Sequence, residues 1–307
     1  MLNFLYAFDR NYTTQGCVSI YSLLENVEEK INIFVILDSS NENYIFPEKI
    51  SHHKNLNNFI VKDVEVEERF YNISSSHVSK ATFYRLYLSF LFEREDIVLT
   101  YLDADIICVS NPVKEITSII KTMEAEEQAI AFADEFYRRQ NDEPFLRLNM
   151  HGEKYFNAGV MVVDLMKWKS KNYSKKSLTL IEALRDKAQF WDQDILNSLI
   201  DGDYITIDKN LNHRTSGIGI NKKIKGIVFI HFSGKSKPWD VGGIFEEFAS
   251  IYHKYYEKLF QKKFHVTSRN RKNSLRKLLY YKQHYSLISK SDFIKYILYS
   301  ILAIFKK

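Results

Sequence analysis

The sequence has few of the residues on which several classes of protein depend. Its 307 residues include only two cysteines, Cys17 and Cys108, which excludes a disulfide scaffold and a cysteine-based zinc site and suits a reducing compartment. Ten glycines and four prolines are too few for a collagen-like or low-complexity chain. With 45% hydrophobic and 26% charged residues, the chain has the composition of a globular protein with a sizeable core.

Long apolar runs are missing as well. No stretch approaches the ~18 apolar residues that a membrane-spanning helix needs. The longest candidate, residues 293–305, is shorter and contains Lys295. The first residues, MLNFLYAFDRNYTT, lack a basic region, and Asp9 and Arg10 interrupt their apolar stretch, so we expect no signal peptide. These features favour a protein of the cytoplasm or of a membrane face.

Positive charge is concentrated at the C-terminus. Residues 265–307 contain ten Lys or Arg and one acid, a net charge of +9, whereas the preceding residues carry −4. We therefore divide the chain into a globular domain at 1–264 and a basic helical tail at 265–307. Within the tail, aromatic and aliphatic residues alternate with basic ones, which favours an anchor on an anionic membrane surface. A helix packed on the body, an oligomer contact and, least favoured for want of any motif, a nucleic-acid contact are the alternatives.

The hydrophobic pattern of the first half predicts an open α/β sheet. Continuous apolar runs at 31–37, 96–102 and 160–164 indicate strands buried on both faces. Amphipathic stretches at 15–24 and 115–126 indicate helices between strands. Strands that alternate with helices predict right-handed β-α-β units and one continuous domain.

Two acidic residues follow the apolar run at 96–102. Asp103 and Asp105 are two positions apart, so in an extended segment both carboxylates would project together from the ligand-binding edge of the sheet. Paired carboxylates are most stable beside a divalent cation, and oxygen ligands suit Mg²⁺ or Mn²⁺. The alternative is a solvated acidic turn.

A second polar cluster follows the apolar run at 227–230. His231 could ligate a metal through a neutral ring nitrogen, which would favour Mn²⁺ over Mg²⁺. Gly234 would let the backbone approach a phosphate, and Lys237 would supply a positive charge for it. A buried structural histidine and a surface lysine are the alternatives. Two further segments, around Asn157 and around Asp192 and Gln193, offer groups for sugar hydroxyls, although a β-turn and a helix cap explain them equally well.

Taken together, these motifs resemble glycosyltransferase family 8, and within it the bacterial lipopolysaccharide galactosyl- and glucosyltransferases. The resemblance covers about residues 2–240. It rests on LYAFDRNY, SHVSKATFYRL, VLTYLDADII, YFNAGVMVVDL, FWDQDILN and HFSGKSKPW. It implies a GT-A fold, that is, a Rossmann-like nucleotide-binding sheet continuous with an acceptor-binding half. It also implies transfer of galactose or glucose from a UDP-sugar with retention, using Mn²⁺ or Mg²⁺.

The resemblance also implies a role for each matching residue. Asp103, Asp105 and His231 would be the metal ligands, and Gln193 would lie beneath the anomeric carbon. The other matches are Ala7, Phe8, Asp9 and Asn11 for uridine, Ala104 beside the metal ligands in the nucleotide site, Gly234 and Lys237 for the diphosphate, Arg85, Asn157 and Asp192 for the donor sugar, and His77 for the acceptor.

The resemblance leaves the reaction path and the acceptor open. Retention normally requires a carboxylate nucleophile, and Gln193 is an amide, so we favour front-face attack by the acceptor hydroxyl. Asp192 is the alternative nucleophile. The expected acceptor is a lipid-linked glycan such as the core of lipopolysaccharide or lipooligosaccharide, at the inner face of the cytoplasmic membrane. A protein acceptor such as an adhesin, or a non-catalytic nucleotide- or membrane-binding module, is the alternative.

Overall fold

A computed structural model describes residues 1–38, 45–64, 80–215, 224–234, 236–240, 243, 246–264, 294 and 297–298. The basic tail predicted for 265–307 and the predicted acceptor residue His77 lie outside these residues, apart from three tail positions. No helix among the described residues is both long and apolar enough to cross a membrane.

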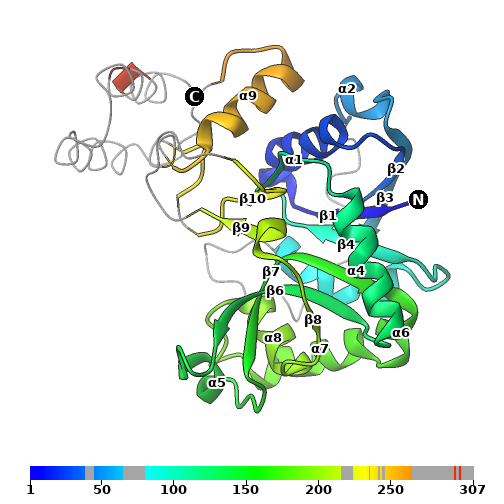
Figure 1. The fold of residues 1–307 in the computed structure, drawn as a ribbon, viewed down its shortest axis with the longest axis vertical. Helices are drawn as coiled ribbons and strands as arrows, with labels where there is room; N and C mark the ends of the chain where they lie inside the picture. The colour runs from blue at the N-terminus through cyan, green and yellow to red at the C-terminus, as the bar shows by residue number, and fades with distance from the viewer. Residues whose placement is uncertain are drawn as a thin grey trace.

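A seven-stranded sheet forms the centre of the molecule, in the order β3-β2-β1-β4-β7-β6-β8 (Figure 1). Its first four strands are parallel, β7 is antiparallel to β4 and to β6, and β8 is parallel to β6. The strands are β1 (Asn3–Ala7), β2 (Ile31–Asp38), β3 (Leu56–Val64), β4 (Val98–Leu102), β6 (Ile130–Tyr137), β7 (Lys154–Asp164) and β8 (Ile205–Thr206). The predicted parallel-rich α/β sheet is confirmed.

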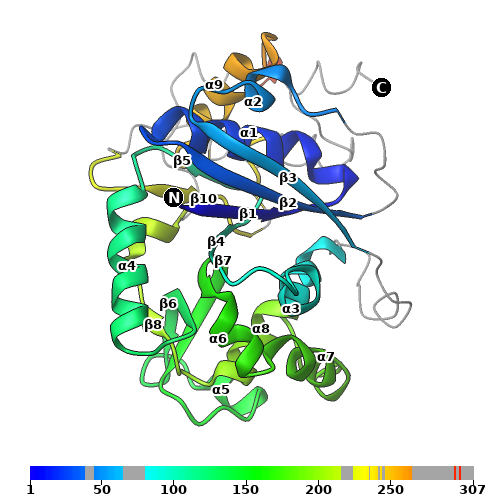
Figure 2. The same cartoon turned by 90° about the vertical axis from the view of Figure 1, so that its right-hand side faces the viewer.

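Helices cover both faces of the sheet (Figure 2). On one face lie α1 (Thr13–Asn26), α2 (Glu48–Ser51) and α9 (Ala249–Phe260). On the other lie α3 (Leu88–Leu91), α6 (Leu165–Ser170), α7 (Tyr173–Ala183) and α8 (Trp191–Ile200). The remaining helices are α4 (Val113–Ala125), α5 (Glu143–Arg147) and the 3₁₀ segments Arg10–Tyr12, Lys80–Tyr87 and Lys209–Asn212.

The apolar runs are explained by this double cover. In β1, Phe4 and Tyr6 belong to the core beneath α1 and α9, whereas Leu5 and Ala7 belong to the core beneath α3 and α8. Because every side chain of such a strand is buried on one face or the other, the sequence shows no polar alternation.

A second, three-stranded sheet brings the C-terminal part of the domain to the end of β4. It has the order β5-β10-β9, with β5 at Ile106–Cys108, β10 at Phe229–His231 and β9 at His213–Arg214. Since β5 directly follows the acidic pair after β4, and β10 pairs with β5, residues far apart in the chain meet there.

Candidate active site

Asp103 and Asp105 lie on a turn between β4 and β5. The Ile106 amide donates to the Asp103 carbonyl (3.1 Å), which closes the turn, and the Asp103 amide donates to Gly159 on β7 (2.9 Å). The two carboxylates do project together, as predicted, but from a turn and not from an extended segment. After this turn the chain leaves the seven-stranded sheet and enters the second sheet as β5.

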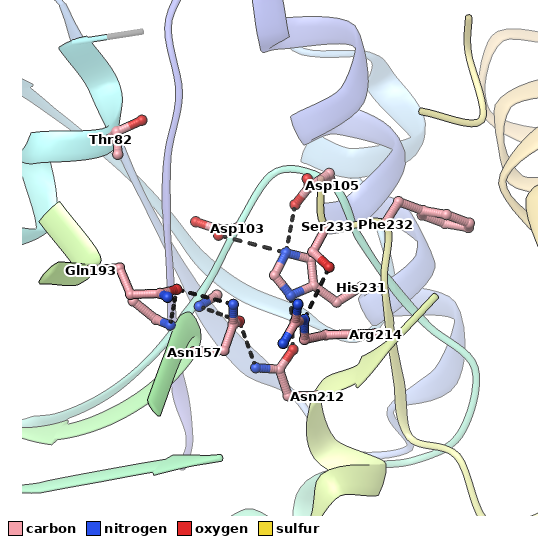
Figure 3. A network of polar contacts seen from close by, with 12 residues as sticks. Thr82, Asp103, Asp105, Asn157, Gln193, Asn212, Arg214, His231, Phe232 and Ser233 are labelled. Carbon is pink, nitrogen blue, oxygen red and sulfur yellow. Dashed lines mark hydrogen bonds and ion pairs between the residues drawn. The ribbon is translucent and has the colours of Figure 1, made fainter. Parts of the chain in front are cut away.

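Strand pairing brings His231 to the two acids. In the antiparallel β5–β10 pair, His231 lies opposite Ile106, and the amide of Phe232 donates to the Asp105 carbonyl (3.1 Å). Buried His231 places Nε2 3.4 Å from Asp105 Oδ1 and 3.9 Å from Asp103 Oδ2 (Figure 3). One ligand atom from each residue lies within 4.8 Å of the others.

Each acid presents one oxygen to His231 and has the other engaged. Asp103 Oδ1 accepts hydrogen bonds from Arg85 Nη2 (2.6 Å) and from the Tyr101 hydroxyl (2.8 Å). Asp105 Oδ2 pairs with Lys237 Nζ (2.5 Å). Asp105 Oδ1 is buried and has no hydrogen-bond partner among the described residues. Two carboxylate oxygens and an imidazole nitrogen that face one another in this way fit a divalent cation.

Lys237 sets the charge state of Asp105. Burial alone would raise the pKa of the Asp105 carboxyl, but Lys237 and His231 hold this pKa well below its usual range. Burial lowers the pKa of Lys237, but Asp105, Tyr12 and Asp103 together raise this pKa above its usual value. Both groups are therefore ionised at neutral pH, and the Lys237 ammonium also donates to the Phe232 carbonyl (2.7 Å).

Arg85 joins the acidic turn to α8. Its buried guanidinium contacts Asp103 and lies 2.9 Å from Asp192 Oδ2 at the start of α8. It also stacks over the Tyr101 ring, 4.2 Å from the centroid, and donates to the Ala158 carbonyl. Burial raises the pKa of Asp192 to about 7; Arg85 opposes this rise and Asp103 adds to it.

Gln193 is held at both ends of its amide. Its Oε1 accepts from Asn157 Nδ2 (3.0 Å) and from the Ala158 backbone amide (3.1 Å). Its Nε2 donates to Glu135 Oε2 (3.1 Å) and to the Tyr155 hydroxyl (3.2 Å). Asn157 and Gln193 thus lie together beside the acidic turn (Figure 3). Asp192 is connected to the same turn through Arg85.

The residues predicted for uridine lie at the end of β1. Because Tyr6 pairs with Leu102 in the parallel β1–β4 ladder, Ala7 and Phe8 are level with the acidic turn. The Phe8 ring is buried against Gly16, where a Cβ would lie 2.3 Å from it, so only the Phe8 backbone can face a nucleotide. Asp9 caps the following 3₁₀ turn by accepting from the amides of Asn11 and Tyr12.

The remaining predicted positions follow β10 and β4. Gly234 has a φ of +88°, a conformation that favours glycine, and no atom within 4 Å of where a Cβ would lie. Ala104 is buried between the two acids. The roles assigned to all these residues stay predictions, because the geometry shows their positions and not their ligands.

Sequence reasoning assigned no individual role to Glu135, Asn212 or Asp194. Glu135 falls at a register shift in the β6–β7 pair, where a bulge turns its side chain toward Gln193, so a second acid besides Asp192 lies near Gln193. Asn212 Oδ1 lies 2.8 Å from His231 Nδ1. Asp194 accepts from Tyr155, Arg147 and two backbone amides before α8. Only the D-Q-D spacing could have indicated Asp194; the sequence carries no comparable signal for the other two.

Comparison with known proteins gives this arrangement a class. The profile described as glycosyl transferase family 8 matches residues 3–242. A lipopolysaccharide 1,2-glucosyltransferase of Escherichia coli is 27% identical over 252 residues, 77% of this chain and 73% of that protein. A lipopolysaccharide 1,3-galactosyltransferase of Salmonella typhimurium is 27% identical over 259 residues, 79% of this chain and 74% of that protein.

A solved structure agrees in fold. The galactosyltransferase LgtC, crystallised with donor and acceptor sugar analogs, superposes with a TM-score of 0.69 at 21% identity, covering 84% of this chain and 96% of that one. The fold is therefore of the GT-A type, which is a fold of glycosyltransferases. The chain belongs to glycosyltransferase family 8, as its motifs predicted.

Proposed function

We propose that this protein is a retaining hexosyltransferase that moves galactose or glucose from a UDP-sugar to a hydroxyl of a lipid-linked surface glycan. The single observation that carries this proposal is the convergence of Asp103, Asp105 and His231 at the end of β4. A divalent cation there, Mn²⁺ before Mg²⁺, would neutralise the charge that develops on the departing diphosphate. The relatives' printed names support a hexose donor and a lipopolysaccharide acceptor.

Different charged side chains would bind the phosphate and the sugar of the donor. The Lys237 ammonium lies beside Asp105, where it can transfer its contact to a phosphate oxygen. Arg85 and Asp192 form a buried ion pair at the start of α8, where a donor sugar would present its hydroxyls. The backbone after Ala7 and the turn at Gly234 would flank the nucleotide.

The tied amide of Gln193 favours front-face transfer. Both ends of this amide are engaged in hydrogen bonds, so its oxygen has little freedom to attack a sugar carbon. In the reaction we propose, the bond from the anomeric carbon to the diphosphate breaks while the acceptor oxygen bonds to the same face. The acceptor proton passes to the leaving diphosphate oxygen. Gln193 and its neighbours position the sugar and exclude water.

The charge of the chain supports an acceptor at a membrane. Exposed basic side chains lie on α9 and directly after it, close to the start of the basic tail. They are Lys254 and Lys258 on α9, and Lys262 and Lys263 after it. Together with the alternating basic and aromatic residues after Phe264, they would attract the enzyme to anionic lipid at the inner face of the cytoplasmic membrane.

A screen of UDP-sugars with Mn²⁺, followed by UDP release, tests the proposed activity. We expect one UDP-hexose to be turned over by the wild type and none by Asp103→Ala, with Asp96→Ala, an exposed acid before β4, as the matched control. Comparable activity in Asp103→Ala would reject the site. Covalent trapping of a sugar on Asp192 or Glu135 with a slow donor would reject front-face transfer.

Deletion of residues 266–307 tests the acceptor side. The truncated chain should lose sedimentation with anionic vesicles and keep UDP-sugar hydrolysis, since the described site lies wholly before that point. Persistent membrane binding by the truncated chain would show that the tail is not the anchor. Transfer to a peptide in place of a lipid extract would identify a protein acceptor.

A further inference from the structure

A chain of side-chain amides connects His231 to Gln193. Asn212, at the end of the 3₁₀ segment Lys209–Asn212, places Oδ1 2.8 Å from His231 Nδ1 and donates through Nδ2 to Asn157 Oδ1 (2.9 Å). Asn157 Nδ2 in turn donates to Gln193 Oε1 (3.0 Å) (Figure 3). Asn212 and Asn157 are buried, at 4% and 8% exposure, so water does not compete for these bonds.

Backbone amides fix the direction of every bond in this chain. The amide N–H of Gly159 can only donate, and it points at Asn157 Oδ1 (3.1 Å). The end of Asn212 that faces the same oxygen must therefore be its NH₂ group, which leaves the Asn212 oxygen facing His231. At the other end, the N–H of Ala158 and the carboxylate of Glu135 impose the same direction on Gln193.

This direction determines which ring nitrogen of His231 carries hydrogen. Since the Asn212 oxygen can only accept, Nδ1 of His231 must be the donor. In the neutral ring Nε2 then bears the lone pair, and Nε2 is the nitrogen that faces Asp103 and Asp105. The backbone amide of Gly159 thus determines, through three successive hydrogen bonds, that Nε2 of His231 is free to bind a metal.

We propose that Asn212 is a positioning residue that fixes the Nδ1–H form of His231 for the metal and, through Asn157, ties the metal site to Gln193. The inference rests on the divalent-cation site proposed above. A second partner that orients a ligating histidine changes metal affinity by about 10- to 100-fold when it is lost. The asparagine amide accepts from His231 with its oxygen and donates to Asn157 with its NH₂ group, so one side chain serves both contacts.

Two substitutions separate the two bonds of Asn212. Asn212→Ala removes both, so Mn²⁺ should bind about 10- to 100-fold more weakly in a calorimetric titration of the full chain. Asn212→Asp keeps the acceptor for His231 and loses the donor to Asn157. Its Mn²⁺ affinity should therefore stay at or above that of the wild type, while kcat at saturating Mn²⁺ falls about fivefold or more.

Asn210, exposed on the same 3₁₀ segment, provides the matched control. Asn210→Ala and Asn210→Asp should leave both quantities unchanged. Wild-type Mn²⁺ affinity in Asn212→Ala would overturn the role toward His231, and unchanged kcat in Asn212→Asp would overturn the tie to Gln193. Failure of the wild type itself to bind Mn²⁺ would instead reject the proposed metal site.

Discussion

Removal of the Lys237 ammonium should move the affinities for metal and nucleotide in opposite directions. Lys237 Nζ lies 2.5 Å from Asp105 Oδ2, so the ammonium partly neutralises a carboxylate that we propose as a metal ligand. In Lys237→Met the aliphatic stem remains and the positive charge is lost. Mn²⁺ then meets an unpaired carboxylate, whereas a diphosphate loses its lysine contact.

The structure sets the size of both effects. Unit charges at 2.5 Å attract by about 7 kcal/mol at an effective dielectric constant of about 20, and desolvation of the buried pair offsets most of this. A remainder of about 1–2 kcal/mol predicts Mn²⁺ binding about 5- to 30-fold tighter. Loss of a charge-assisted hydrogen bond, about 1.5–3 kcal/mol, predicts UDP binding about 10- to 150-fold weaker.

Two titrations measure these effects. Mn²⁺ is titrated without nucleotide, and UDP is titrated at saturating Mn²⁺, both by calorimetry on the full chain. Lys209→Met removes an exposed lysine and is the control for net charge. Weaker Mn²⁺ binding in Lys237→Met, or unchanged UDP binding, would refute the reasoning.

Three further substitutions test other parts of the site. Gly159→Ala would place a Cβ 2.2 Å from His231 Cε1, so Mn²⁺ affinity should fall at least tenfold, and wild-type affinity would contradict the packing. Glu135→Gln weakens the hold on Gln193 and should lower kcat with the Mn²⁺ dissociation constant unchanged; the reverse pattern would contradict the assignment. Burial raises the pKa of Asp192 to about 7, above the unfolded value of about 3.9, so its stabilising contribution at low pH is lost as pH rises through 7. In metal-free buffer, Asp192→Asn should therefore gain Tm relative to the wild type between pH 5 and pH 8, and a relative loss would contradict the burial argument.

Much of the fold could be predicted from the apolar runs. The strands before Asp38 and before Asp103 are buried on both faces, and their uninterrupted hydrophobic residues already indicate a parallel sheet covered by helices. The edge of the sheet at which ligands bind follows from strand direction alone, so Asp103 could be assigned to the site before its partners were known.

The rest depends on features that have no local pattern. Asp103 and Asp105 meet His231 because β5 and β10 pair, and strand pairing between distant segments cannot be read from the spacing of residues. Bulges in β6 and β7 turn Glu135 and Asn157 toward the site, although the sequence there looks like uninterrupted strand. The role of a buried asparagine such as Asn212 becomes visible only when the structure shows the histidine that it contacts.

Anomalous diffraction from crystals of the full chain grown with MnCl₂ and UDP tests the central claim most directly. The claim predicts one manganese peak bounded by Asp103, Asp105 and His231 and in contact with the diphosphate. Bound UDP with no manganese among these three side chains, or a manganese peak only at other residues, would contradict it.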